Sequence, residues 1–326
     1  MRKPITGVLT VAAVAAAGMF TAVPASADLV TRCVGTAGEV TVPGDLVVPA
    51  GETCDLTGTT VDGDVRVRAG SDLIGDGVSI TGDVVGAGDA YIDLSGSEVA
   101  GAVTLNNAYG VVLEESTVTG RVLTRAADDE AGAFVYSLDA DLGADLVART
   151  GDVYVEAGSV AGNLSSVGTT YTDVYGAFID GRLVVRDTAE GSMLCGVTVQ
   201  GTSRIGGNAD VVQIGSDGPA TDCDLGASYW GDTLRVDTNT GGVVIDDVIV
   251  NADLRLVDNE PLAQLGDNVR VRGEVIGDSD PIAERSLRTF AESDADSHRD
   301  AIQDRIAERT ATAQEQAAEA GSAGLD

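Results

Sequence analysis

A five-residue phrase recurs along this chain: an apolar residue, any residue, a small residue, any residue and a second apolar residue. In its first five copies the central residue is glycine, and successive glycines lie 19 positions apart, at Gly44, Gly63, Gly82, Gly101 and Gly120. Later, less regular copies are centred on Ala144, Gly162, Gly181, Gly201, Asp232, Ala252 and Gly273. A fixed period near 20 residues is typical of a solenoid, whose coils bury their apolar faces only by stacking on one another.

Alternation of apolar and polar residues around the phrase predicts short β-strands. Stacked coils would then form two inward-facing columns. The first is Val42, Val61, Ile80, Val99, Val118, Val160, Ile179 and Val199, and the second is Leu46, Val65, Val84, Val103, Val122, Leu164 and Leu183. The central glycine is expected at a sharp corner, where a side chain would crowd the neighbouring coil. The fold class expected for residues 28–280 is all-β, a right-handed parallel β-helix of about twelve coils.

The two ends of the chain have different compositions. Residues 1–27 read as a signal peptide, because a basic start and an apolar stretch precede the small-residue cleavage site Ala25-Ser26-Ala27. Residues 281–326 read as an acidic helical or disordered tail, with a helix over roughly residues 297–320. That helix could cap the last coil, pair with another chain or fray, and the sequence leaves these three open.

Four cysteines remain after the signal segment, an even number in a chain expected to be exported. Cys33 and Cys54 are 21 residues apart, about one coil, so stacking would place them on adjacent coils. Cys195 and Cys223 are then left as the second pair. The alternative, a cysteine metal site, lacks any C-x-x-C spacing, so we expect two structural disulfides.

The formal net charge is −32. A protein this acidic is repelled by nucleic acid and by anionic lipid and attracts cations. We therefore expect no nucleic-acid partner and no membrane insertion once the signal is cleaved. The protein would be secreted, either extracellular or loosely associated with the cell envelope.

Three aspartates, Asp45, Asp64 and Asp83, directly follow glycines of the repeat. In-register stacking would place their carboxylates in one exposed column, about 5 Å apart. Such a column invites Ca²⁺, a hard cation that binds several oxygens. The other interpretation is that Gly-Asp is simply favourable turn chemistry on a solvated face. Calcium is the one candidate ligand, and no cofactor is expected.

An enzyme must also be considered, because β-helices often host polysaccharide lyases and hydrolases. The motifs of pectinase-type hydrolases and of pectate lyases are absent, and no catalytic residue is assigned. A carbohydrate-active site would lie beside the insertions at residues 126–131 and 215–224, since loops often carry function. Its candidate residues, chosen only by their position, are Asp222, Asp224, Trp230 and Asp232.

The opening of the mature chain carries a resemblance. Residues 33–36 (CVGT), 46–51 (LVVPAG) and 54–58 (CDLTG), behind a secretion signal, resemble a family of uncharacterised secreted actinobacterial repeat proteins. That resemblance implies export and a repetitive β fold, and it implies no activity.

These observations favour a non-enzymatic secreted β-helix that is structural or adhesive at the cell surface. Its expected partner is extracellular or wall polysaccharide, and we expect a monomer. A polysaccharide lyase or hydrolase is the main alternative. A third is end-to-end self-assembly, which a disulfide-linked first coil and a capping tail would oppose.

Overall fold

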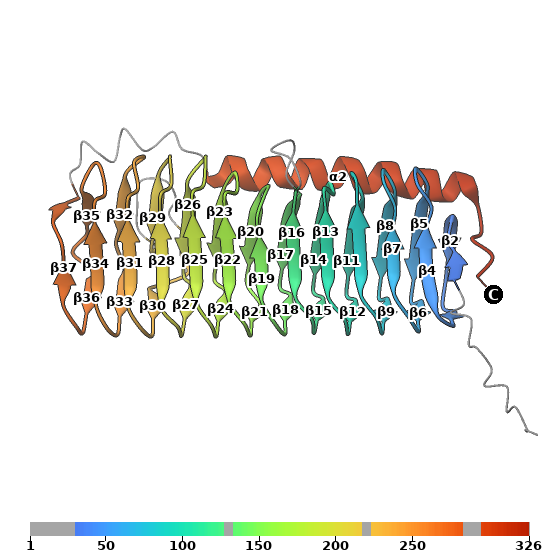
Figure 1. Cartoon of the computed structure of the whole chain (residues 1–326), viewed down its shortest axis with the longest axis horizontal. Helices are drawn as coiled ribbons and strands as arrows, with labels where there is room; N and C mark the ends of the chain where they lie inside the picture. Colours follow the sequence, from blue (N-terminus) through green and yellow to red (C-terminus); the bar gives the residue numbers. More distant parts are fainter. Residues whose placement is uncertain (1–29, 127–132, 217–222, 283–294, 326) are drawn as a thin grey trace, which may run out of the picture.

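Three parallel β-sheets wind around one hydrophobic core in the computed structural model, which describes residues 30–126, 133–216, 223–282 and 295–325. Successive strands enter sheets A, B and C in turn, so each trio forms one coil (Figure 1). Sheets A and B each hold thirteen strands and sheet C holds twelve. The predicted parallel β-helix is therefore confirmed, with one coil more than the repeat count indicated.

Sheet A comprises β1 (Val30–Arg32), β4 (Asp45–Val48), β7 (Val65–Val67), β10 (Val84–Ala87), β13 (Val103–Asn106), β16 (Val122–Arg125), β19 (Leu146–Ala148), β22 (Leu164–Val167), β25 (Leu183–Arg186), β28 (Ser203–Gly206), β31 (Leu234–Asp237), β34 (Leu254–Val257) and β37 (Val275–Ile276). Sheet B comprises β2 (Gly35–Ala37), β5 (Thr53–Thr57), β8 (Asp72–Asp76), β11 (Tyr91–Ser95), β14 (Gly110–Glu114), β17 (Phe134–Leu138), β20 (Val153–Glu156), β23 (Thr172–Tyr175), β26 (Ser192–Cys195), β29 (Val212–Ile214), β32 (Val243–Ile245), β35 (Ala263–Leu265) and β38 (Ser279–Pro281). Sheet C comprises β3 (Thr41–Val42), β6 (Thr60–Val61), β9 (Ser79–Ile80), β12 (Glu98–Val99), β15 (Thr117–Val118), β18 (Asp141–Leu142), β21 (Ser159–Val160), β24 (Phe178–Ile179), β27 (Thr198–Val199), β30 (Ser228–Trp230), β33 (Val248–Val250) and β36 (Val269–Val271).

Strand register reproduces both predicted inward columns. In sheet C, Val42 pairs with Val61 and Val61 with Ile80, and in sheet A, Leu46 pairs with Val65. All of these side chains are fully or almost fully buried. Branched aliphatic residues suit this position because they fill a pleated wall at low cost in side-chain freedom.

The corner glycines lie where a side chain would meet the preceding coil, as the repeat predicted. A Cβ added to Gly101 would lie 2.3 Å from the carbonyl oxygen of Gly82, and the Gly101 N–H donates a hydrogen bond to that oxygen at 3.1 Å. Ala144 occupies the equivalent corner of a later coil. Within the described residues its N–H makes no such bond to Gly120, and neither do the N–H groups of Gly63 and Gly162 to the preceding corners.

One helix, α2 (Ala295–Ala320), lies lengthwise along sheet B and runs back toward the first coil (Figure 1). Beyond it, Gly321 accepts a hydrogen bond from the Thr36 N–H at 2.8 Å, and the Ala323 N–H donates to the Thr36 carbonyl at 2.8 Å. Ala323 and Leu325 pack against the core at this end. The predicted helix is confirmed, but the idea that it caps the last coil is wrong: it covers one side, and the residues after it close the first coil.

Both predicted disulfides are present, Cys33–Cys54 and Cys195–Cys223. The first joins adjacent coils across 21 residues, with Cα atoms 5.5 Å apart. Within the described residues no helix has the length and apolarity needed to cross a membrane. The predicted signal segment, residues 1–27, lies outside the described residues.

Candidate functional site

Sheet B carries an aromatic stripe on its outer face, beneath α2. Six of the seven tyrosines and one phenylalanine lie in or directly before its central strands: Tyr91, Tyr109, Phe134, Tyr136, Tyr154, Tyr171 and Tyr175. Neighbouring rings contact one another, with Tyr136 stacked on Tyr154 at 5.3 Å and Tyr109 edge-on to Phe134 at 5.5 Å. An aromatic stripe of this kind is typical of ligand-binding surfaces, but here the chain's own helix lies on it.

Arginines of α2 bind carboxylates that lie in register with aromatic residues of the stripe: Asp72 with Tyr91, and Asp152 between Phe134 and Tyr171. Arg309 pairs with the almost fully buried Asp72 at 2.9 Å and lies 5.0 Å above the Tyr109 ring. Arg305 pairs with Asp152 and lies over Phe134. Burial raises the pKa of Asp72, and the Arg309 guanidinium opposes that rise. A buried carboxylate needs such a partner, so charge fixes the helix on this face.

His298 is held near the start of α2. Its Nδ1 lies 2.9 Å from a carboxylate oxygen of the fully buried Asp173, and its ring stacks on Tyr171 at 4.0 Å. Burial lowers the pKa of His298, but the hydrogen bond and the charge of Asp173 outweigh it, so the pKa is raised overall. Burial likewise raises the pKa of Asp173. The protonated imidazole is therefore favoured while the helix is docked.

The spacing of helix contacts matches the spacing of coils. His298 contacts β23, and Gln316 accepts a hydrogen bond from Thr53 of β5, six strands away in sheet B. Six coil spacings span roughly 29 Å at about 4.8 Å each. The 18 residues between the two helix positions span about 27 Å at 1.5 Å per residue. The helix therefore stays in register with the wall beneath it over this length.

The predicted aspartate column is assembled, and its oxygens serve the backbone. Oδ1 of Asp45 accepts the N–H of Asp64, and Oδ1 of Asp64 accepts the N–H of Asp83, both at 3.0 Å. Arg66 pairs with both Asp45 and Asp64. Hydrogen bonds from Arg66 and from the Asp64 backbone lower the pKa of Asp45. No group of three or more His, Cys, Asp or Glu in the described chain is placed to hold a metal ion, and calcium binding stays a prediction.

Sheet A carries an arginine column that sequence reasoning missed. Arg204, Arg235 and Arg255 pair in register on the adjacent strands β28, β31 and β34. Asp237, whose side chain is 2% exposed, accepts two hydrogen bonds from Arg204, at 2.9 and 2.7 Å, and one from Arg235 at 3.2 Å. Burial alone would raise the pKa of Asp237, but these bonds outweigh it and lower the pKa. The carboxylate is thus held ionised and orients the guanidinium groups of two arginine side chains that are 40–43% exposed.

The two insertions suggested for an enzyme site lie at different corners of the coil, one between β16 and β17 of sheets A and B, the other between β29 and β30 of sheets B and C. Trp230 is fully buried in the core and offers no platform for a sugar ring, so its assignment is wrong. Asp224 and Asp232 are exposed. Asp222 lies outside the described residues, as do residues 127–131.

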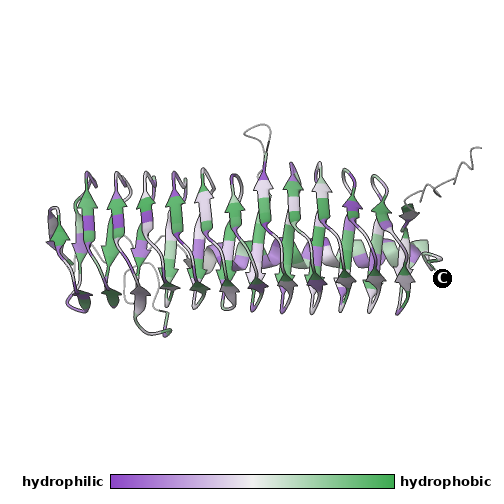
Figure 2. Ribbon diagram, turned by 60° about the horizontal axis from the view of Figure 1, so that its bottom comes forward, coloured by the Kyte–Doolittle hydropathy of each residue, from purple (hydrophilic) through white to green (hydrophobic). Residues whose placement is uncertain are grey.

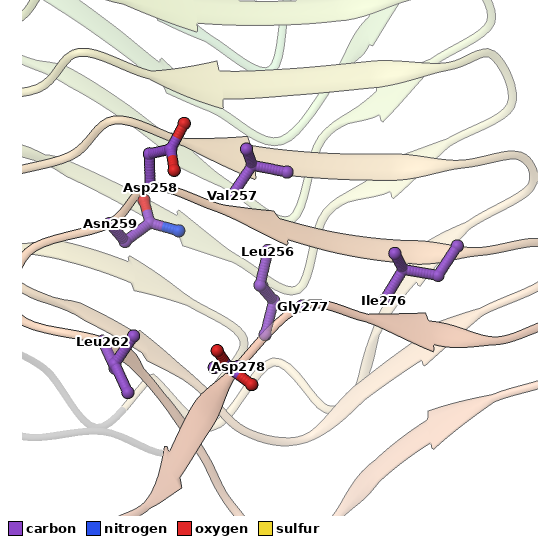
Figure 3. A pocket seen from close by; sticks show the side chains of 8 residues that line it. All are labelled: Leu256, Val257, Asp258, Asn259, Leu262, Ile276, Gly277 and Asp278. Atoms are coloured by element: carbon purple, nitrogen blue, oxygen red, sulfur yellow. The ribbon is translucent and has the colours of Figure 1, made fainter.

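A shallow pocket of about 390 Å³ opens at the last coil (Figure 3). Leu256, Leu262 and Ile276 give it an apolar part, and Asp258 and Asp278 give it charge. It lies beside β37 and β38, the last described strands of sheets A and B, beyond which no described strand packs. Figure 2 shows how the hydrophobic strands continue to this end of the molecule.

Comparison of the chain with family models, with curated proteins and with solved structures gives no match. The resemblance to secreted repeat proteins therefore stays an expectation, and the chemistry of this chain is argued from its own residues.

Proposed function

We propose that this protein is a secreted, non-catalytic rod that binds acidic polysaccharide at the cell surface through the arginine column of sheet A. The observation that carries the proposal is the triplet Arg204, Arg235 and Arg255 on adjacent strands of a strongly acidic protein. Guanidinium groups bind carboxylate and phosphate in a planar, two-point geometry. Adjacent coils are about 4.8 Å apart, so the column offers a regular row of donors to a polymer with repeating anionic groups.

The rigid wall supports this role. Asp237 fixes two of the three guanidinium groups before any ligand arrives, which reduces the entropy that binding must overcome. Arg255 pairs with Asp253 at 3.0 Å, and its side chain is 46% exposed. Export is supported by the two disulfides, since disulfides persist in oxidising compartments.

The experiment is binding of the disulfide-bonded protein to acidic and neutral wall or extracellular polysaccharides. It is run with calcium and with chelator, at two salt concentrations, and each polymer is checked for released sugar. The test variant carries Arg235→Gln and Arg255→Gln, which leaves the Arg204–Asp237 pair intact. The control is Arg66→Gln, an arginine in the same column of sheet A whose in-register neighbours are Val47 and Val85.

We expect salt-sensitive binding to acidic polymers, at least tenfold weaker in the double variant and unchanged in the control. Equal loss in both variants, or equal binding to neutral polymers, would refute the arginine column as the binding surface. Binding that requires calcium would favour the aspartate column instead. Released oligosaccharide would overturn the non-catalytic assignment.

A further inference from the structure

The two ends of the solenoid differ in a way that points to a partner. At the first coil, Ala323 and Leu325 cover the core and residues 321–323 pair with β2. At the last coil no described residue covers the core in this way. The inward position of sheet A is fully buried at Leu254 of β34, yet 47% exposed at Val275, the residue paired with it in β37.

Among the described strands, each sheet also ends there on a strand paired along one edge only, namely β36 in sheet C, β37 in sheet A and β38 in sheet B. An exposed strand edge presents unpaired backbone groups that can pair with a strand of another chain. Because the first coil's sheet B edge is already occupied, head-to-tail stacking of copies is obstructed there. The remaining arrangement joins two identical last coils, which makes a closed dimer with two-fold symmetry.

The charges on these end strands select one such arrangement. A two-fold axis perpendicular to the rod pairs one end strand with its own copy and pairs the other two with each other, all antiparallel. Arg270 is central and outward-facing in β36, and Asp280 is central and outward-facing in β38. Pairing β36 or β38 with its own copy would place like charges opposite one another. Pairing β37 with its own copy places Arg270 of each chain opposite Asp280 of the other.

The neighbouring side chains fit this arrangement. Within the described residues Arg270 and Asp280 form no ion pair, and Arg270 donates only to the backbone carbonyls of Asp267 and Val269. Strand β37 carries the apolar Val275 and Ile276, both exposed, which would cover each other across the axis. Directly opposite cross-strand charges of unlike sign stabilise antiparallel pairs, and like signs destabilise them.

We propose that two copies of this chain associate through their last coils, with β37 paired to itself across a two-fold axis and β36 of each copy paired to β38 of the other. The dimer is a rod of twice the length. It covers the pocket of Figure 3 and ends at both tips in the closed first coil.

The test is the molar mass of the full disulfide-bonded chain, measured by light scattering or sedimentation over a concentration series. Two single charge reversals, Arg270→Asp and Asp280→Arg, and the double variant carrying both are compared with wild type. Asp62→Arg is the control, because it reverses an exposed aspartate far from the last coil. Circular dichroism melting of every variant monitors folding.

We expect a wild-type dimer whose dissociation constant rises at least tenfold in either single variant. In the double variant, which recreates both opposite-charge pairs, the dimer should return, and the control should dimerise as wild type. A wild-type monomer at all concentrations, open-ended polymers, or a double variant no better than the single variants would each overturn the proposal. If a single variant fails to fold, Val275→Asp replaces it, with loss of the dimer expected and its retention contradicting the interface.

Discussion

Replacing Gly101 by alanine tests how closely the coils of this wall approach one another. The added Cβ would lie 2.3 Å from the Gly82 carbonyl oxygen and 2.4 Å from Oδ1 of Asp83. These two oxygens accept hydrogen bonds from the N–H groups of Gly101, at 3.1 Å, and Ala102, at 2.7 Å. Relief of the clash therefore requires the corner to move outward and to weaken both bonds.

Two weakened bonds cost about 1 kcal/mol each, and the strain of overpacking adds roughly 1 kcal/mol or more. Removing a glycine recovers about 0.4–1 kcal/mol by restricting the unfolded chain. We expect a net loss of about 2 kcal/mol, below the upper range for overpacked cores because the corner at Ala144 already tolerates a methyl group without its hydrogen bond. For a solenoid of this size the melting temperature should fall by roughly 4–8 °C.

The assay is equilibrium denaturation with Gly38→Ala as matched control. A Cβ at Gly38 would meet nothing within 4 Å, and its φ is not in the left-handed region. That control should be neutral or stabilised by up to about 1 kcal/mol. If Gly101→Ala is no less stable than the control, the reasoning about close coil approach at the corners is refuted.

Three further predictions concern the helix and the first coil. Docking of α2 should weaken as the pH rises above about 6.5, the pKa of a histidine in the unfolded chain. The pKa of His298 is raised in the folded protein, so its protonated form stabilises the docked helix fully below the unfolded-state pKa, and this stabilisation is lost as the pH rises through the folded-state pKa. Amide hydrogen exchange of α2, corrected for intrinsic rates, should become faster over this pH range, and His298→Gln should abolish the pH dependence. An unchanged pH profile in that variant would rule out the His298–Asp173 pair as the cause. Ile302→Ala removes a fully buried side chain between α2 and the aromatic stripe. In the same exchange measurement the free energy of helix opening should fall by about 2–4 kcal/mol. No change would mean that this aliphatic contact does not hold the helix. Replacing Cys33 and Cys54 by alanine removes a link across 21 residues. We expect the free energy of unfolding, measured by denaturant titration, to fall by about 3 kcal/mol. A free energy of unfolding equal to that of the wild type would contradict this expectation.

The parts of the fold that could be predicted are those where one face of a strand is buried and the other solvated. Strands of sheets A and C alternate in this way, so positions such as Val61 and Val65 were enough to predict which side chains form the core and how neighbouring strands pair. Sheet B does not alternate, because α2 buries its outer face as well; Val111, Val112 and Leu113 are all buried in succession. Periodicity is lost in such strands.

The docking of α2 was unpredictable from its apolar stripe for a related reason. Its contact face combines Ile302 and small alanines with Arg305, Arg309 and Thr310, each of which donates a hydrogen bond to an aspartate in or directly before a strand of sheet B. A hydrophobic pattern does not register such a face. The recurrence of tyrosine in every coil between Tyr91 and Tyr175 was the available signal. The arginine column escaped notice because Arg204, Arg235 and Arg255 are separated by unequal insertions, and only strand pairing makes them neighbours.

The match in pitch between α2 and the coils bears on how a gene for such a protein can change length. Duplicating one coil beneath the helix would displace every later contact by about 4.8 Å, so a compensating insertion of about three helical residues at 1.5 Å each would be needed. Among the described residues, the α2 ion pairs furthest from the first coil are those of His298 with Asp173 of β23 and with Glu190, just before β26. Repeats after β26 can be gained or lost without shifting these helix contacts if the connection from β38 back to α2 changes length with them, so variation in rod length is expected on the C-terminal side of β26.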